Sequence, residues 1–174
     1  MAKKSLFPPK LLGGVESPAR VMLRPAVMSP NAKWKFGKSA LVWGIKVDGI
    51  EPSGSFDALI GYEPTLVPTI WSGKKFTVGI EFEAEDPLAR YSFQVIYGCG
   101  DPSVFDALTT RPFEGRPASR DRFGFGLDHK RLIPGEILRV TLRVIRLITH
   151  KDTKDEPMPP PPVYVYGVWL ELEV

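Results

Sequence analysis

The chain has 174 residues, of which 43% are hydrophobic and 25% are charged, and this balance excludes wholesale disorder and fits one globular domain. Its single cysteine, Cys99, excludes an intramolecular disulfide, and no run of about 18 apolar residues is present to cross a membrane as a helix. The lysines near the N-terminus have no apolar stretch behind them, so we expect no secretory signal and synthesis in a cytoplasm.

The net charge of +3 is unevenly distributed. Residues 1–46 carry nine basic residues against one acid, an excess of eight, so the remainder carries −5. A basic segment on an acidic body predicts contact with a polyanion, namely nucleic acid, anionic lipid or an acidic neighbouring subunit. The alternative is a solvated arm without a partner. The candidate contact residues of the arm are Lys3, Lys4, Lys10, Arg20 and Arg24.

The first 39 residues are rich in proline and show little hydrophobic periodicity. We therefore expect residues 1–39 to form an extended arm with at most one short strand, near residues 19–23, and residues 40–174 to form the folded domain. Residues 40–47 form an almost continuous apolar run of the length of a buried strand. Residues 55–62 predict the next strand, and residues 65–71 an edge strand or irregular segment, because Pro68 interrupts them.

Residues 75–83 give the clearest strand signal, because apolar and polar residues alternate without a break. After a turn at Asp86-Pro87 the same alternation continues over residues 91–97, which predicts an antiparallel hairpin of these two segments. Residues 98–135 are mostly irregular, with a short strand or helical turn expected near 104–108 and another strand near 123–127.

Residues 136–149 are ambiguous. Arg139, Arg143 and Arg146 would share one face of a helix, yet Val, Ile and Thr dominate and apolar residues alternate as far as Val144. We interpret the segment as a long strand with a β-bulge at Val144-Ile145. Residues 151–162 then predict a polyproline-like connector, and residues 163–174 a final strand.

These elements predict an all-β fold, a single jelly-roll β-sandwich of about eight strands, because their long and uneven connections do not suit an up-and-down barrel. Ten apolar positions of the alternating segments are expected in the core between the two sheets. They are Phe76, Val78, Ile80, Phe82, Phe93, Val95, Val140, Leu142, Val168 and Leu170.

The sequence contains no catalytic signature. The Gly-x-Ser-x-Gly, Walker A and dinucleotide fingerprints are absent, and only two histidines, His129 and His150, are available as metal ligands or as a base for Cys99. We therefore expect no enzyme activity, no catalytic or metal residues and no cofactor.

Aromatic residues supply the candidate contact sites. Trp34 lies between two lysines and Trp71 beside Ser-Gly, whereas Trp43 and Trp169 lie in apolar strands and are expected in the core. The stretch 111–125 alternates arginine with aromatics, a pattern that suits single-stranded nucleic acid but is diluted by two acids. The interface candidates are Trp34, Phe36, Trp71, Phe123 and Phe125.

A proline-stiffened jelly roll with a basic Met-Ala-Lys-Lys start and no reaction centre resembles the smaller major capsid protein of the tailless, membrane-containing icosahedral phages of Thermus. The resemblance covers the β-pattern of residues 40–174 and rests on overall character. It implies a virion coat subunit that stands upright in the capsid and associates as a dimer or higher oligomer. It further implies a larger jelly-roll capsid protein as partner and an internal lipid membrane beneath. The proline-rich loops are compatible with a thermophilic host.

Two other functions stay open at this stage. One is a carbohydrate- or nucleic-acid-binding β-sandwich module that uses the exposed aromatics. The other is an enzyme whose site has no recognisable motif.

Overall fold

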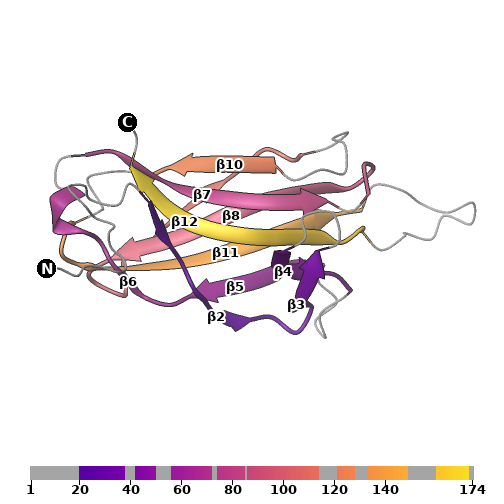
Figure 1. Ribbon diagram of the computed structural model, residues 1–174, viewed down its shortest axis with the longest axis horizontal. Coiled ribbons are helices and arrows are strands. Elements are labelled where there is room, and N and C mark those ends of the chain that lie inside the picture. The colour runs from indigo at the N-terminus through magenta and orange to yellow at the C-terminus, as the bar shows by residue number, and fades with distance from the viewer. Residues whose placement is uncertain are drawn as a thin grey trace, which may run out of the picture.

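A computed structural model describes residues 20–37, 42–49, 56–71, 74–84, 86–113, 121–127, 133–148 and 160–172. These residues form two antiparallel sheets packed face to face (Figure 1), so the predicted β-sandwich is confirmed. Among them, no helix has the length and apolar content needed to cross a bilayer.

Each sheet has five strands in one path and a sixth attached to it. The first sheet runs in the order β10 (Asp121–Gly126), β7 (Phe76–Ala84), β12 (Val163–Leu172), β4 (Val42–Val47) and β3 (Ala32–Gly37), with β1 (Arg20–Met22) paired to β12. The second runs in the order β2 (Pro25–Met28), β5 (Ala58–Tyr62), β11 (Ile137–Leu147), β8 (Arg90–Cys99) and β9 (Asp106–Thr109), with β6 (Thr65–Leu66) paired to β11.

The strand order is that of a jelly roll. From β4 onward the chain changes sheet at every connection except β5–β6 and β8–β9, which gives the interleaved orders β4-β12-β7-β10 and β5-β11-β8-β9. The predicted hairpin of residues 75–83 with 91–97 is therefore wrong. β7 and β8 lie in opposite sheets, because the turn at residues 86–89 carries the chain across the sandwich.

The expectation of at most one short strand before residue 40 is wrong: β1 is the strand expected near residues 19–23, but β2 and β3 follow it. Residues 20–37 form three strands of the sandwich, β1, β2 and β3, which belong to both sheets, and Leu23 is buried. Residues 1–19 lie outside the described part of the chain.

The core lies between the sheets and contains all ten predicted positions, none of which is more than 3% exposed. Phe82 lies at its aromatic centre, with its ring centroid 4.9 Å from that of Phe93 and 5.3 Å from that of Phe113.

The predicted β-bulge at Val144-Ile145 is absent, because β11 pairs with β8 in one unbroken register from Leu138 to Leu147. Arg146 occupies the next inward position and is only 3% exposed, while Ile145 faces outward. The arginine in a core-facing position, and not a shift of the strand, breaks the apolar pattern. Among the described strand pairs, register shifts lie instead in β12, between Val165 and Gly167, and in β2, between Pro25 and Val27.

Candidate interaction surface

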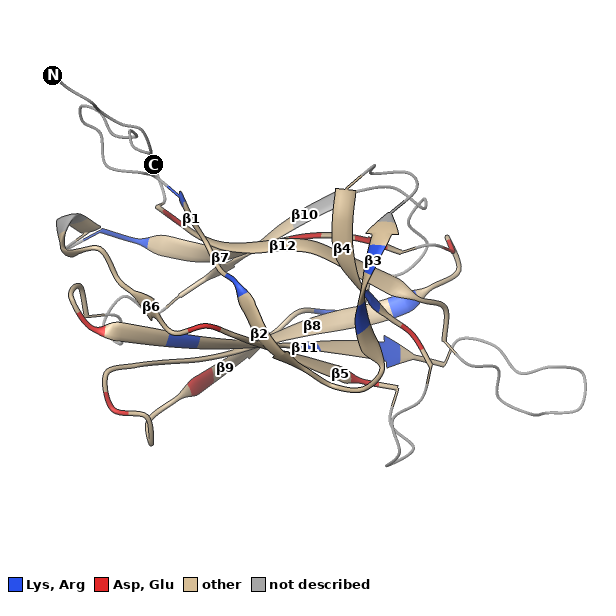
Figure 2. Cartoon of the chain, turned by 60° about the horizontal axis from the view of Figure 1, so that its bottom comes forward, with Lys and Arg blue, Asp and Glu red and all other residues tan. Residues whose placement is uncertain are grey.

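β3 and β4 extend beyond the body of their sheet as a two-stranded ribbon. β3 pairs with β4 along its full length, from Ala32–Val47 to Gly37–Val42, whereas β12 pairs with β4 only from Ile45 to Val47. Figure 2 shows β3 and β4 running across the direction of the long strands. The outer part of β4 thus has β3 as its only strand partner among the described residues.

The β12 bulge explains where this pairing stops. The ring of Tyr166 covers Gly44, so closely that a Cβ at Gly44 would lie 2.7 Å from Tyr166 Cδ1. The Tyr166 hydroxyl is held in turn by donating to Glu83 Oε1 at 2.6 Å. A side chain at residue 44 would displace this ring, so glycine is required there.

One face of the ribbon is aromatic. Trp34 is paired with the core residue Ile45, and Phe36 with Trp43, so Trp34, Phe36 and Trp43 continue the core-facing side of the sheet. Nevertheless they are 51%, 44% and 63% exposed. The rings of Phe36 and Trp43 meet edge to face, with centroids 5.7 Å apart and planes at 74°. We call these three residues the ribbon face.

The opposite side of the ribbon carries lysines, and the basic positions of β3 are blue in Figure 2. Lys33 Nζ lies 3.8 Å from Asp48 Oδ1, and Lys46 Nζ lies 3.6 Å from Asp48 Oδ2. Lys35 is exposed and has no ion pair within the described ranges. The ribbon therefore combines exposed aromatic rings with positive charge.

The structure sorts the predicted interface candidates into two groups. Trp34 and Phe36 lie on the ribbon, and Trp43, expected in the core, lies there with them. The sequence carries a signal for the pairing of Phe36 with Trp43, although not for the exposure of Trp43. Gly37-Lys38-Ser39 has turn chemistry, and a hairpin around it would bring Phe36 and Trp43 opposite each other.

Trp71 and Phe125 are not contact sites, because both are buried. Trp71 ends the 3-10 turn Thr69–Trp71 and packs on Phe76, with ring centroids 5.4 Å apart. Phe123 and Phe125 lie opposite Ile80 and Val78 across the β10–β7 pair, so both point to the core, and Phe123 is half-buried.

Burial also removes two aromatic rings of the stretch 111–125 from the surface where nucleic-acid bases could stack. Phe113 is buried and stacks on Tyr91, with centroids 5.5 Å apart and planes at 28°. Because Phe113 and Phe125 belong to the core, they cannot serve as stacking platforms for nucleic-acid bases.

The candidate arm contacts fall mainly outside the described residues, which begin at Arg20. Arg20 itself pairs with Glu171 at 3.0 Å and lies 4.6 Å above the Trp169 ring. Trp169 is buried as expected, but on the outer surface of its sheet, where it covers Gly79. Arg24 is exposed, and Lys3, Lys4 and Lys10 lie outside the described ranges.

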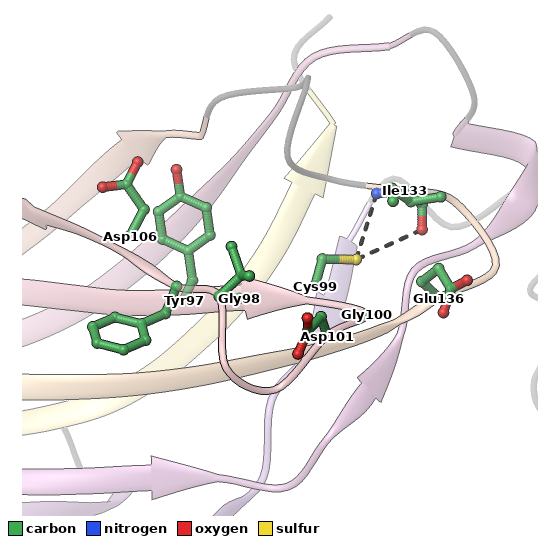
Figure 3. A pocket seen from close by; sticks show the side chains of 10 residues that line it. Tyr97, Gly98, Cys99, Gly100, Asp101, Asp106, Ile133 and Glu136 are labelled. Atoms are coloured by element: carbon green, nitrogen blue, oxygen red, sulfur yellow. Dashed lines mark hydrogen bonds between the residues drawn. The ribbon is translucent and has the colours of Figure 1, made fainter.

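A second feature is a pocket of about 430 Å³ at the end of β8, shown in Figure 3, which we call the end pocket. Cys99 at its floor has its Sγ 3.4 Å from the backbone nitrogen of Ile133. The lining residues include three acids and no base, namely Tyr97, Gly98, Cys99, Gly100, Asp101, Val104, Phe105, Asp106, Ile133 and Glu136.

The end pocket shows no arrangement for metal or nucleophilic chemistry within the described residues. No group of three His, Cys, Asp or Glu side chains there is placed to hold a metal ion. The two histidines, His129 and His150, lie outside the described ranges. Asp101 accepts from the Ser103 backbone N–H at 2.9 Å and from its hydroxyl at 2.8 Å, and these hydrogen bonds lower the pKa of the carboxyl.

Comparison with known proteins gives only distant likenesses. No protein-family model matches the chain, and no curated protein matches it. A solved structure of the CBM22-1–GH10 modules of Clostridium thermocellum xylanase 10B with xylohexaose is similar over 90% of this chain and 26% of that one, at 8% identity and a TM-score of 0.48. This chain thus spans about a quarter of that protein.

Two further solved structures are mannan-binding modules. Caldicellulosiruptor saccharolyticus CBM27-1 in complex with mannohexaose is 8% identical over 81% of this chain and 82% of that one, at a TM-score of 0.48. TmCBM27 is 9% identical over 90% of each chain, at a TM-score of 0.42. What those proteins bind is a property of those proteins, and the function proposed below rests on residues of this chain.

Proposed function

We propose that this protein is a structural subunit that assembles with copies of itself through the ribbon face, as the coat subunit of an icosahedral virus. The observation that carries the proposal is the exposure of Trp34, Phe36 and Trp43 on the core-facing side of a ribbon that the second sheet leaves uncovered. The proposal includes no catalytic step and no cofactor.

Physical reasons favour a protein partner for this face. A two-stranded ribbon is at best marginally stable alone in water, so the outer part of β3–β4 gains from being covered. Large aromatic side chains supply much of the binding energy of protein interfaces, and contiguous exposed apolar patches mark such interfaces. Jelly rolls occur both in viral capsids and in lectins, so the fold alone does not decide the function.

The capsid setting adds further proposals, which come from the resemblance of the sequence. They are a location in the virion, a larger jelly-roll capsid protein as a second partner, and contact of the basic arm with an internal lipid membrane or the genome.

Replacement of Trp34 and Trp43 together by serine is expected to convert an oligomer into a monomer, because it removes both tryptophan rings of the ribbon face. Light scattering coupled to size-exclusion chromatography measures the molar mass of the two proteins. The matched control is Leu88→Ser, since Leu88 is 59% exposed in the β7–β8 turn and should not affect assembly. A wild-type protein that stays monomeric at millimolar concentration contradicts the proposal.

A carbohydrate-binding module is the second candidate, and the observation in its favour is the pair of exposed tryptophans, Trp34 and Trp43. The planes of Phe36 and Trp43 lie at 74° to each other, so these two rings do not form one flat platform for a sugar chain. Electrophoresis through gels containing xylan or mannan separates the two functions. The carbohydrate module would be established if the wild-type protein were a monomer whose migration the polysaccharide slows, and if the Trp34/Trp43 variant migrated without this delay.

The basic arm gives an independent prediction. Replacing Lys3, Lys4 and Lys10 by glutamine should leave unfolding by urea unchanged but weaken assembly, or binding to anionic liposomes. The loss should be largest at low salt, because the Debye length is about 8 Å at physiological ionic strength. Normal assembly and liposome binding at every salt concentration would show that the charge asymmetry has no such function, and unfolding would place the arm in the core.

A further inference from the structure

We propose that the ribbon of one copy docks into the end pocket of the next copy, so that subunits associate head to tail. This inference rests on the proposed function, because it names the surface that receives the ribbon face.

The rim of the end pocket is apolar, and its exposure to water is energetically unfavourable. Val104, Phe105 and Ile133 line it and are 51%, 66% and 53% exposed, although all three are large apolar side chains. Its volume of about 430 Å³ is within the roughly 300–1,000 Å³ of small-molecule pockets, so it could receive side chains at the edge of a docked ribbon. A partner that brings aromatic rings would cover this rim and be covered by it.

The charge of the end pocket selects the kind of partner. Asp101, Asp106 and Glu136 all line it. The described lining residues include no base, and the nearby Arg139 donates to the Gly100 carbonyl at 3.2 Å. The occupant that fits is therefore apolar and cationic.

The ribbon has this composition. It presents Trp34, Phe36 and Trp43 on one face and Lys33 and Lys35 on the other, and it is only two strands wide. A ribbon inserted between the apolar rim and the acids would place rings against Phe105 and lysines near carboxylates. Complementary charge of this kind fixes the orientation and speeds association.

The two surfaces lie at different places on one subunit, which determines the symmetry of the contact. β8 ends at the left of Figure 1, whereas β3 and β4 are at its right. The end pocket is lined by the last residues of β8 and therefore lies away from the ribbon. A contact between different surfaces is heterologous, so it builds rings or extended arrays and not a closed two-fold dimer.

A charge exchange tests the inference. Lys35→Glu and Glu136→Lys are the variants, because both side chains are exposed and neither forms an ion pair within the described ranges. Each variant alone should associate about tenfold more weakly than wild type in sedimentation velocity at low salt, through like-charge repulsion. An equimolar mixture of the two should recover association, since each ribbon then meets a pocket of opposite charge.

Two charge-matched controls accompany the exchange. Lys75→Glu and Glu63→Lys change exposed residues outside the ribbon and the pocket lining, and should leave association unaffected. Phe105→Ser should weaken association by removing the most exposed apolar group of the rim, whereas Leu88→Ser should not.

The outcomes separate this inference from the proposed function. Failure of the mixture to recover, or normal association of both Glu136→Lys and Phe105→Ser, overturns the docking of ribbon into pocket. If the Trp34/Trp43 variant is then still monomeric, self-assembly through the ribbon face stands and its receiving surface lies elsewhere. A monomeric wild type overturns both proposals.

Discussion

Phe82→Ala should lower the free energy of unfolding by about 3–5 kcal/mol, the cost usual for removing a buried phenylalanine ring. Phe82 is 1% exposed, and its ring contacts those of Tyr91, Phe93 and Phe113, with centroids between 4.9 and 5.9 Å away. The substitution leaves a cavity at the point where both sheets contribute aromatic rings. Urea unfolding followed by tryptophan fluorescence measures the loss.

Phe105→Ala is the matched control, because Phe105 is 66% exposed and should contribute less than about 0.5 kcal/mol to the free energy of unfolding. A loss below about 1 kcal/mol for Phe82→Ala would mean that the packing between β7 and β8 is not as described.

Arg146→Met should cost a comparable amount, about 3–5 kcal/mol, although it exchanges a charged residue for an apolar one, because each buried carbonyl left without a donor costs about 1–3 kcal/mol. The Arg146 guanidinium donates to the carbonyls of Phe56 and Pro160, each at 3.0 Å, and to that of Gly49. Burial lowers the pKa of Arg146, while Asp48 and Asp57 oppose the shift. Methionine would fill the space but leave three carbonyl oxygens without their donors.

Arg139→Met provides the comparison on the same strand. Arg139 is exposed on the outer side of β11, and its one side-chain hydrogen bond within the described residues goes to Gly100, so its loss should cost less than about 1 kcal/mol. Equal free energies of unfolding for the two variants would show that the buried hydrogen bonds of Arg146 add no more stability than the exposed one of Arg139.

Alternation in the sequence predicts which side of a strand is buried, because side chains on a strand point alternately to its two faces. For that reason Phe76 to Phe82 and Phe93 to Val95 are found in the core. Alternation does not say which strand is the neighbour. A short turn after β7 predicts a hairpin, and nothing local reveals that the chain crosses to the other sheet.

Of the strands in residues 20–37, β1 is the short strand expected near residues 19–23, whereas β2 and β3 escaped prediction for a related reason. β1 has three residues and β2 has four, so neither is long enough to show a clear period. They are strands because β12 and β5 supply their partners from far along the chain. This tertiary stabilisation outweighs weak local preference.

The tryptophans show how little of the candidate site can be predicted from local sequence. Trp43 lies in an apolar run and Trp71 beside Ser-Gly, yet Trp43 is exposed and Trp71 is buried. Exposure of Trp43 depends on where β12 stops pairing with β4, which the bulge at Tyr166 determines more than 120 residues later. Only the assembled sheet shows that the ribbon face is uncovered.

The position of β12 has a consequence for how the protein is made. β12 is the last strand of the chain, yet it lies between β7 and β4 and also pairs with β1, where the hydrogen-bonded side chains of Arg20 and Glu171 are 151 residues apart. During synthesis, β7 and β4 therefore wait without their common neighbour until residues 163–172 leave the ribosome. The pairing of β12 with β7, β4 and β1 can form only after residues 163–172 have been synthesised, and such long-range pairing makes folding slow. Until then a nascent chain exposes the unpaired edges of β7 and β4, and early contact with another nascent copy leads to aggregation and not to assembly.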